Sequence, residues 1–497
     1  FVRYLKYLSA LLIIALMLFQ VTAAAYEGNG GSTSYTYDEN GNDVSIPDAY
    51  TFKKSVDITD SEGVRASDPH GLVVSEETGK TYVVDTGNNR ILVFSDDFSY
   101  EKALSEFKNG GETLQLNQPE GMFVYKNGDL LIADTQNNRI IKCNADGNVK
   151  QVIERPENMT GVSDSEVFLP VKLAVDSIGR IYVVARNINR GIIQLDSQGK
   201  FMGYIGSPQV QYDIMTIILR RFYTEAQQAK SEQFVPTEYN NICMDGEDFL
   251  WATISSLDAE DIENTIKSKD KSGSVTPVKK LNTMGTDVLK RNGFYAPMGD
   301  LEFDEEPSRI IGVSTSDNGV YSMLDQQNGH VFTYDDNGNL LFVFGKLGNE
   351  KSSFQTPADI RYKGDQILVL DSGLGKIFVF SPSSYGELVL EAVASQYNGD
   401  YEEAYGLWSQ LASQNTNFKY AFVGLGNAML EQGEYDAALK YFKYAEDTER
   451  YSDTVEIIRK QNVQKYFPAI MVTVIVIAVV ILLYHIIRRF VRYYKGS

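Results

Sequence analysis

Polar side chains that could contact a ligand recur at one place in a repeated motif of this sequence. The motif has the form Pro-x-Gly and is plainest at 69–71 and 119–121. Along the chain, its middle position holds His70, Glu120, Val171, Asn240, Ile311 and Ala358, and the next position holds Gly71, Gly121, Lys172, Asn241, Gly312 and Asp359. Imidazole, carboxylate, amine and amide groups brought together can hold a polyol or a peptide end through hydrogen bonds.

Six repeats carry these positions. They cover about 68–104, 117–155, 168–206, a stretch that starts at 239 and resumes at 278, then 308–345, and finally 356 onward. Each repeat has three or four short apolar runs divided by Gly, Asn or Asp turns, which is typical of one four-stranded antiparallel blade. The last repeat runs out of strand at Phe380, so we expect a strand near 49–56 to supply its outer strand and close a ring.

The best-preserved motifs are Pro69–Gly71, Pro119–Gly121 and the D-x-x-N-x-R turns at Asp85–Arg90 and Asp134–Arg139. They resemble the NHL-repeat family of six-bladed β-propellers over about 35–382. The resemblance implies a six-bladed propeller at 26–384. The family includes lyases, lactonase relatives and pure binding modules, so this fold does not fix a function.

The Asp and Arg of these turns recur in several blades, which favours a structural role. Asp would cap turn amides and Arg would tie adjacent strands. A unique residue in a repeated place is better evidence of function than a repeated one. By this rule the ligand-binding candidates are the polar residues at the motif positions, namely His70, Glu120, Lys172, Asn240, Asn241 and Asp359.

These six residues would form a binding site at the mouth of the propeller or an ordinary water-filled funnel lining. A gluconolactonase-like enzyme would need a divalent metal there, held by oxygen and amide ligands, and a carboxylate for proton transfer. Only Glu120 and Asn240 would contribute convincingly, and no third carboxylate can be identified. We expect no catalytic residue and no cofactor, with a metal-dependent hydrolase or lyase as the alternative.

Two insertions interrupt the repeats at 208–235 and 255–274. In a blade, the links between blades and the loops between the second and third strands emerge on one face, here called the top face. Both insertions and the links 101–116 and 156–166 would lie there, where recognition is usually built. The spacing of Ile214, Ile217, Ile218 and Phe222 predicts a helix in 211–234, whereas 255–274 is expected to be a solvated polar loop.

Two further segments echo calcium loops. They are Asp38-x-Asn40-x-Asn42 and Asp335-x-Asn337-Gly338. Neither has the Glu that an EF-hand loop carries at position twelve, so both are predicted to be hairpin turns.

The two ends of the chain have the character of membrane-targeting segments. A charged start, a short apolar run and Ala23–Ala25 predict a signal peptide at 1–25, with an uncleaved anchor as the alternative. Near the other end, a predicted transmembrane helix at 467–487 includes 19 residues without formal charge at 469–487. The tail 488–497 carries Arg and Lys and is expected in the cytoplasm, which leaves the bulk of the chain outside.

Between propeller and span, the pattern becomes helical. A Gly-x-Tyr motif at Gly399 and again at Gly433 resembles the tetratricopeptide repeat, which implies paired helices over 385–450. The matching residues are Trp408, Phe422, Leu425, Gly426, Ala428, Gly433, Tyr435, Ala438, Phe442 and Ala445. A juxtamembrane helix over 451–466 would continue into the span.

Composition narrows the possible partners. The net charge of −20 makes nucleic-acid binding improbable, since that needs a basic face. Cys143 and Cys243 cannot build a disulfide framework and are read as buried small residues. We therefore predict a mainly β, membrane-anchored protein of the bacterial surface that binds protein partners through the top face or the helical repeats. Carbohydrate is a further candidate ligand, because similar proteins suggest a link with sugar uptake.

Overall fold

The computed structural model describes residues 34–157, 159, 166–206, 238–303 and 306–495. The chain divides into two compact units. The propeller unit holds the residues up to Tyr37 and Ser45–Glu387, and the helical unit combines Asp38–Val44 with Leu388–Ser497. The predicted signal peptide and the predicted helix over 211–234 lie outside the described residues.

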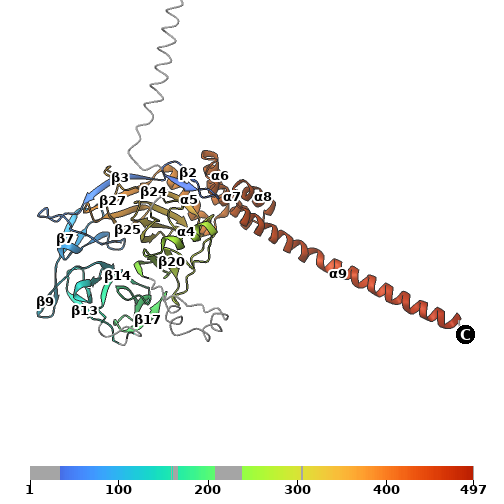
Figure 1. Ribbon diagram of the computed structural model, residues 1–497, viewed down its shortest axis with the longest axis horizontal. Coiled ribbons are helices and arrows are strands. Elements are labelled where there is room, and N and C mark those ends of the chain that lie inside the picture. The colour runs from blue at the N-terminus through green and yellow to red at the C-terminus, as the bar shows by residue number, and fades with distance from the viewer. Residues whose placement is uncertain (1–33, 158, 160–165, 207–237, 304–305, 496–497) are drawn as a thin grey trace, which may run out of the picture. The chain divides into compact units, whose positions relative to one another are not determined.

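Six β-sheets of the propeller unit form the blades (Figure 1). Blades 1 to 3 consist of β4 (Gly71–Ser75), β5 (Lys80–Asp85), β6 (Arg90–Phe94) and β7 (Tyr100–Leu104); β10 (Gly121–Val124), β11 (Leu130–Asp134), β12 (Arg139–Cys143) and β13 (Val149–Ile153); β14 (Leu169–Val175), β15 (Ile181–Arg186), β16 (Ile192–Leu195) and β17 (Phe201–Ile205). Blades 4 to 6 consist of β18 (Tyr239–Met244), β19 (Leu250–Ile254) and β20 (Val278–Leu281); β21 (Ile310–Thr315), β22 (Val320–Asp325), β23 (Val331–Asp335) and β24 (Leu340–Phe344); β25 (Pro357–Lys363), β26 (Gln366–Asp371), β27 (Lys376–Pro382) and β3 (Tyr50–Asp57).

The blades close into a ring. The first strand of each blade contacts the first strand of the next, and β25 of blade 6 contacts β4 of blade 1. The outer strand of blade 6 is β3, which pairs antiparallel with β27 from Tyr50↔Pro382 to Asp57↔Lys376. The prediction that an N-terminal strand near 49–56 completes the last blade is therefore confirmed.

Apolar side chains fill the layers between neighbouring blades. Val84 and Ile91 of blade 1, for example, pack in one cluster with Met122 and Ile132 of blade 2. Because each middle strand is covered on both faces by other blades, its sequence is a nearly continuous apolar run, such as the fully buried Leu130–Asp134. This packing explains why the repeats could be recognised by short apolar runs.

The repeated Asp and Arg hold the turns of the blades, as predicted. Asp85 accepts a hydrogen bond from the Ser67 amide at 2.7 Å and one from Arg90 Nε at 2.6 Å. Asp134 does the same for the Asn117 amide at 2.7 Å and Arg139 Nε at 2.8 Å. Both carboxylates are fully buried, so these charge-assisted bonds satisfy groups that could not otherwise be desolvated.

The two calcium-like segments are hairpin turns, as predicted. Asp38 Oδ1 accepts hydrogen bonds from the amides of Asn40 and Asn42, each at 2.9 Å. Asp335 Oδ1 accepts from the amides of Asn337 at 3.0 Å and Asn339 at 2.8 Å. In this geometry the carboxylate oxygen serves the backbone of its own turn.

The segment 255–274 differs from the prediction. It contains helix α4 (Ala259–Ser268), so the expectation of a polar loop was wrong. Asp258 caps the helix by accepting a hydrogen bond from the Glu260 amide at 2.9 Å. Buried Ile262 and partly buried Ile266 anchor it in a small apolar cluster, and the acids around them concealed the helical pattern.

Other connections carry small regular elements. Within the predicted link 101–116, β8 (Glu106–Asn109) and β9 (Glu112–Gln115) form a hairpin after the end of β7. One-turn helices η1 (Thr86–Asn88) and η2 (Thr135–Asn137) follow the loop aspartates. The short strand β1 (Tyr35–Tyr37) pairs with β24 at the outer edge of blade 5, and β2 (Asp43–Ser45) follows it.

The C-terminal region is helical. Its elements are α5 (Ser384–Asn398), α6 (Tyr401–Gln414), α7 (Lys419–Glu431), α8 (Tyr435–Tyr444) and α9 (Thr448–Lys495). Glycines let these helices approach: a Cβ on Gly424 would lie 2.4 Å from the Trp408 ring, and one on Gly426 would lie 2.4 Å from the Phe442 ring. Because each glycine lacks a side chain, a fully buried aromatic ring of a neighbouring helix packs against its backbone.

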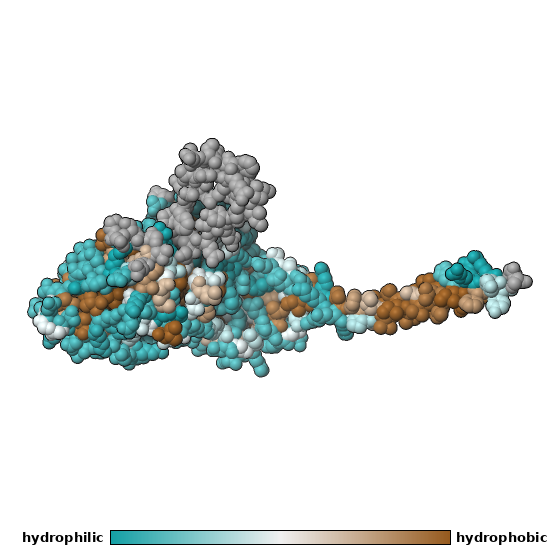
Figure 2. Space-filling model, turned by 90° about the horizontal axis from the view of Figure 1, so that it is seen from below, coloured by the Kyte–Doolittle hydropathy of each residue, from teal (hydrophilic) through white to brown (hydrophobic). Residues whose placement is uncertain are grey.

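In the part of the chain that the structure describes, α9 is the one helix long and apolar enough to cross a membrane. Figure 2 shows the hydrophobic stretch along this helix, with hydrophilic residues near its C-terminal end. The helix is continuous from Thr448, as predicted for a juxtamembrane segment that runs into the apolar stretch, and Pro468 lies inside it.

Candidate functional site

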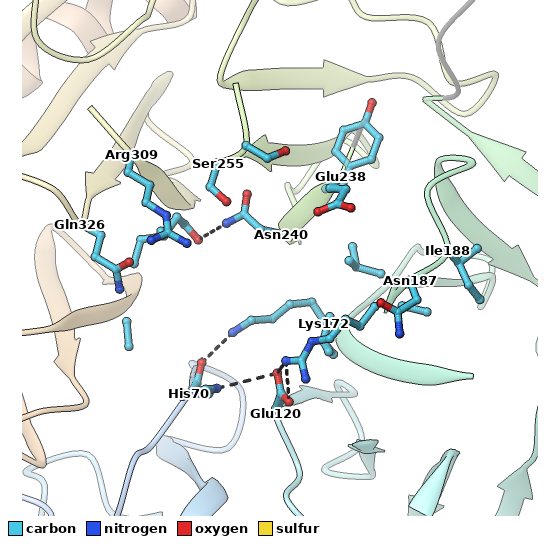
Figure 3. A pocket seen from close by; sticks show the side chains of 18 of the residues that line it. His70, Glu120, Lys172, Asn187, Ile188, Glu238, Asn240, Ser255, Arg309 and Gln326 are labelled. Carbon is cyan, nitrogen blue, oxygen red and sulfur yellow. Dashed lines mark hydrogen bonds and ion pairs between the residues drawn. The ribbon is translucent and has the colours of Figure 1, made fainter. Parts of the chain in front are cut away.

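A cavity of about 530 Å³ lies where the first strands of the blades begin. The middle positions of the six repeated motifs all line it: His70, Glu120, Val171, Asn240, Ile311 and Ala358. Residues at or just after the end of the second strand complete the lining. They include Arg186 of blade 3 and Gln326 of blade 5 (Figure 3). The cavity thus draws side chains from all six blades.

The structure separates the six predicted ligand-binding residues into two groups. His70, Glu120, Lys172 and Asn240 line the cavity. Asn241 and Asp359 do not line it, since both are fully buried and hydrogen-bonded to each other at 3.2 Å. A ligand in the cavity would therefore contact the first group. The second group, Asn241 and Asp359, would support the cavity without contacting the ligand.

The positions after the motif centres make the floor of the cavity. Three of them are glycines at close contacts; a Cβ on Gly121, for instance, would lie 2.3 Å from the Val171 carbonyl oxygen. The other three, Lys172, Asn241 and Asp359, fill the space that the glycines leave. Lys172 Nζ donates to the His70 carbonyl at 2.7 Å and lies 3.5 Å from Asp359 Oδ2. Sequence reasoning had assigned these three polar residues to a ligand, but their contacts connect blades to one another.

Asp359 is the centre of this floor network. Besides Asn241, it accepts a hydrogen bond from the Leu72 amide at 3.1 Å and pairs with Arg361 at 3.0 Å. Burial alone would raise the pKa of Asp359, but the charges of Arg361 and Lys172 outweigh it and hold that pKa below the usual value. Burial lowers the pKa of Lys172, and Asp359 opposes that effect.

On one wall, Glu120 is held by basic neighbours. Its carboxylate accepts from Arg186 Nη2 at 2.6 and 2.8 Å, and His70 Nδ1 lies 3.8 Å away. Nε2 of His70 contacts Asp68 at 3.1 Å. Burial raises the pKa of Glu120, yet its interactions with His70 and Arg186 outweigh burial and leave the pKa lowered. Glu120 is therefore an ionised, paired carboxylate at neutral pH.

Sequence reasoning missed Arg186, although the repeats contain a signal for it. In blades 1 and 2 the residue after the loop aspartate is Thr86 or Thr135, whose hydroxyl donates to the proline carbonyl of the next blade's motif at 2.7 Å. In blade 5, Gln326 donates to Pro357 in the same way at 3.0 Å. Blade 3 has Ala185 in place of the aspartate, and the next residue, Arg186, binds Glu120 instead.

Sequence reasoning also missed Arg309 on the opposite wall. Its amide caps the loop aspartate of its blade, Asp325, at 2.7 Å. The residues that do this in blades 1, 2 and 6 are Ser67, Asn117 and Gln355. Arg309 is thus the cation among these capping residues, and its exposed side chain has no ion-pair or hydrogen-bond partner among the described residues. A comparison of the capping position across the repeats would have found it.

Glu120 should contribute to the dependence of stability on pH. A carboxylate whose pKa is lowered in the folded state stabilises the protein above its unfolded pKa, and that contribution is lost as the pH falls through the folded pKa. We expect the melting temperatures of wild type and Glu120→Gln to differ by a constant amount above about pH 5 and to converge below about pH 4.5. Differential scanning calorimetry from pH 7 to pH 3.5 measures this, and a difference that stays constant throughout would contradict it.

One group of potential metal ligands lies outside the cavity lining. Asp300, Asp325 and His330 bring ligand atoms within 4.8 Å of one another. Their oxygens already accept hydrogen bonds, for example from Tyr35 Oη to Asp300 at 3.0 Å and from Asn328 Nδ2 to Asp300 at 2.7 Å. These contacts fasten β1 to blade 5 and account for the cluster without an ion.

Residues 67–94, which form most of blade 1, match the NHL repeat. No curated protein matches the chain. Among solved structures, virginiamycin B lyase from Staphylococcus aureus is similar with 12% identity and a TM-score of 0.41, over 67% of this chain and 99% of the lyase. A putative gluconolactonase is similar with 12% identity and a TM-score of 0.39, over 66% of this chain and 92% of that one.

Hydrazine synthase from Kuenenia stuttgartiensis is also similar, with 10% identity and a TM-score of 0.40, over 65% of this chain and 97% of that one. All three TM-scores are below 0.5. The six-bladed fold of this chain therefore rests on its own strand pairing, and the site rests on its own residues.

Proposed function

We propose that the propeller is a binding module that holds a small polar ligand in its central cavity and that the chain is attached to a membrane by α9. The observation that carries the proposal is the convergence of the six motif centres on one cavity of about 530 Å³. That volume falls within the range of about 300–1,000 Å³ usual for ligand sites.

The environment of Glu120, the one carboxylate at a motif centre, supports binding over catalysis. A general acid needs a raised pKa, and a nucleophile or base needs a free carboxylate. Glu120 meets neither need, because its pKa is lowered and Arg186 holds its carboxylate at 2.6 Å. These contacts suit a fixed acceptor that orients a ligand.

Glu120 and Asn240, the two residues predicted to hold a metal, are not enough for a divalent ion. A cation at Glu120 would have to displace the Arg186 guanidinium. Asn240 donates Nδ2 to the Ile311 carbonyl at 2.9 Å, so its buried Oδ1 is the one further ligand atom that this pair offers. Calcium and zinc sites need several oxygen, nitrogen or sulfur ligands that converge on one point. The metal-dependent lactonase alternative thus gains no support from this site.

Membrane attachment is supported by the C-terminal sequence. Residues 469–487 carry no formal charge, and Arg488, Arg489 and Arg492 follow directly. The excess of arginine favours a cytoplasmic tail, with the propeller on the other side of the membrane. Proteins or carbohydrates outside the cell are then its partners. A link with sugar uptake stays an expectation from resemblance.

The test is direct binding to the full chain in detergent micelles. A panel of neutral polyols, sugars, amino acids and short peptides is screened by thermal shift and then by calorimetric titration. We expect at least one class to bind the wild type and to lose binding in Ala358→Phe, which fills the cavity from a motif centre. Ala145→Phe, at an exposed turn of blade 2, is the matched control and should bind normally. Equal binding by both variants would overturn the proposal.

A further inference from the structure

The charges in the cavity that remain after internal pairing have opposite signs on different sides. Glu120 pairs with Arg186, and Lys172 pairs with Asp359, which it shares with Arg361. Arg309 remains as a cation without a partner among the described residues, while Glu238 remains as an anion that accepts a hydrogen bond from the neutral Asn189 Nδ2 at 2.8 Å. Both side chains are exposed and line the cavity.

We infer that the ligand of this cavity is zwitterionic, an amino acid or a short peptide with free ends, whose carboxylate binds Arg309 and whose ammonium group binds Glu238. The inference rests on the proposed function and deepens it by naming the ligand class. The planar guanidinium of arginine matches a carboxylate with two parallel hydrogen bonds, and a carboxylate is the natural acceptor for an ammonium group.

The arrangement disfavours ligands of a single charge. An anion drawn to Arg309 would share the cavity with Glu238 and with Asp68, whose side chain is 63% exposed beside His70. A cation drawn to these acids would meet Arg309 and Arg186. No ion pair joins Arg309 to Glu238 among the described contacts, so each charge is available to a ligand that bridges them. A zwitterion satisfies both ends at once.

The surroundings of Arg309 suit a carboxylate end. Figure 3 shows Arg309 and Gln326 projecting from blade 5 toward the cavity, with Ser255 and Asn240 next along the wall and Glu238 beyond them. Gln326 uses its Nε2 on the Pro357 carbonyl at 3.0 Å, which fixes its amide at the edge of the site. The volume of about 530 Å³ accepts a peptide of two or three small residues.

The experiment titrates three probes into the full chain in detergent: trialanine, trialanine amide and N-acetyl-trialanine. We expect trialanine to bind and each blocked probe to bind at least about tenfold more weakly, since each lacks one charged end. In Arg309→Gln, trialanine and its amide should bind equally. In Glu238→Gln, trialanine and its acetylated form should bind equally. Because both residues are exposed, these variants should fold, and Lys200→Gln at a distant exposed turn is the control.

The results separate this inference from the proposed function. If the blocked probes bind as well as trialanine, or if Arg309→Gln and Glu238→Gln leave the preferences unchanged, the inference is overturned. If trialanine fails to bind while a neutral sugar or polyol binds and is lost in Ala358→Phe, the inference falls and the proposed function stands. If no compound class binds, both fall.

Discussion

Asp359→Ala is expected to lower the free energy of unfolding of the propeller unit by about 3–5 kcal/mol. Asp359 is fully buried and accepts from groups in three other blades: the Leu72 amide, Lys172 and Asn241. Removal of the carboxylate leaves the positive charges of Lys172 and Arg361 without their counter-ion in a buried place. The loss is therefore larger than that of one hydrogen bond.

The two tryptophans of the chain make this measurable. Trp251 lies in blade 4 and Trp408 in the helical unit, so a Trp408→Phe background leaves a fluorophore that reports on the propeller alone. Guanidinium unfolding of the full chain in detergent then gives the stability of the propeller. Asp146→Ala is the control, because that side chain is 77% exposed and its pair with Lys102 should contribute little.

A double variant tests whether the lost stability comes from unpaired buried charge. If the cost of Asp359→Ala comes from unpaired buried charge, the double variant Asp359→Ala, Lys172→Met should recover part of the lost stability. Additive losses in the double variant, or an unchanged midpoint in Asp359→Ala, would contradict the role assigned to the floor network.

Phe442→Ala is expected to destabilise the helical unit by about 3–5 kcal/mol, the usual cost of truncating a buried aromatic side chain. The Phe442 side chain is fully buried, and its ring fills the space left by the absent side chain of Gly426. The helix carrying that glycine cannot close the gap without losing its other contacts, so a cavity remains.

Trp408 reports on this unit in a Trp251→Phe background, because it is itself fully buried between helices and hydrogen-bonded to Gln396 at 3.1 Å. Tyr444→Ala is the matched control: it removes an aromatic ring from the same helix, but one that is 69% exposed. If the two variants unfold at the same denaturant concentration, the packing role of Phe442 is wrong.

The ring and its closure could be predicted because their signals are local and repeated. Pro-x-Gly motifs mark the start of the inner strand in blades 1 and 2, where the motif is complete. Loop aspartates such as Asp85 and Asp134 mark the end of the second strand. The last repeat lacked an outer strand, and this gap alone predicted that an N-terminal strand, β3, completes blade 6. In the helical unit, Gly426 and Phe442, two of the residues that carried the resemblance to a helical repeat, are buried in α7 and α8.

The missed features depend on pairing between distant segments. Whether Asp359 serves a ligand or the floor is decided by Lys172 and Leu72, which belong to other blades. Arg186 and Arg309 do not occupy the motif centres, so a comparison of the motif centres alone could not identify them. Helix α4 was not predicted because few apolar residues, buried Ile262 and partly buried Ile266, anchor an otherwise polar segment.

β3, the strand that closes the ring, has a consequence for folding during synthesis of the chain. β3 is made early, yet its partner β27 follows more than three hundred residues later. Because β27 is synthesised after the first five blades, the ring cannot close until then. Pairing between segments so distant in the sequence slows folding. Until then β3 is an unpaired edge that invites aggregation. Its exposed Lys53 and Lys54 discourage that, and a nascent chain released before β27 would leave the ring open.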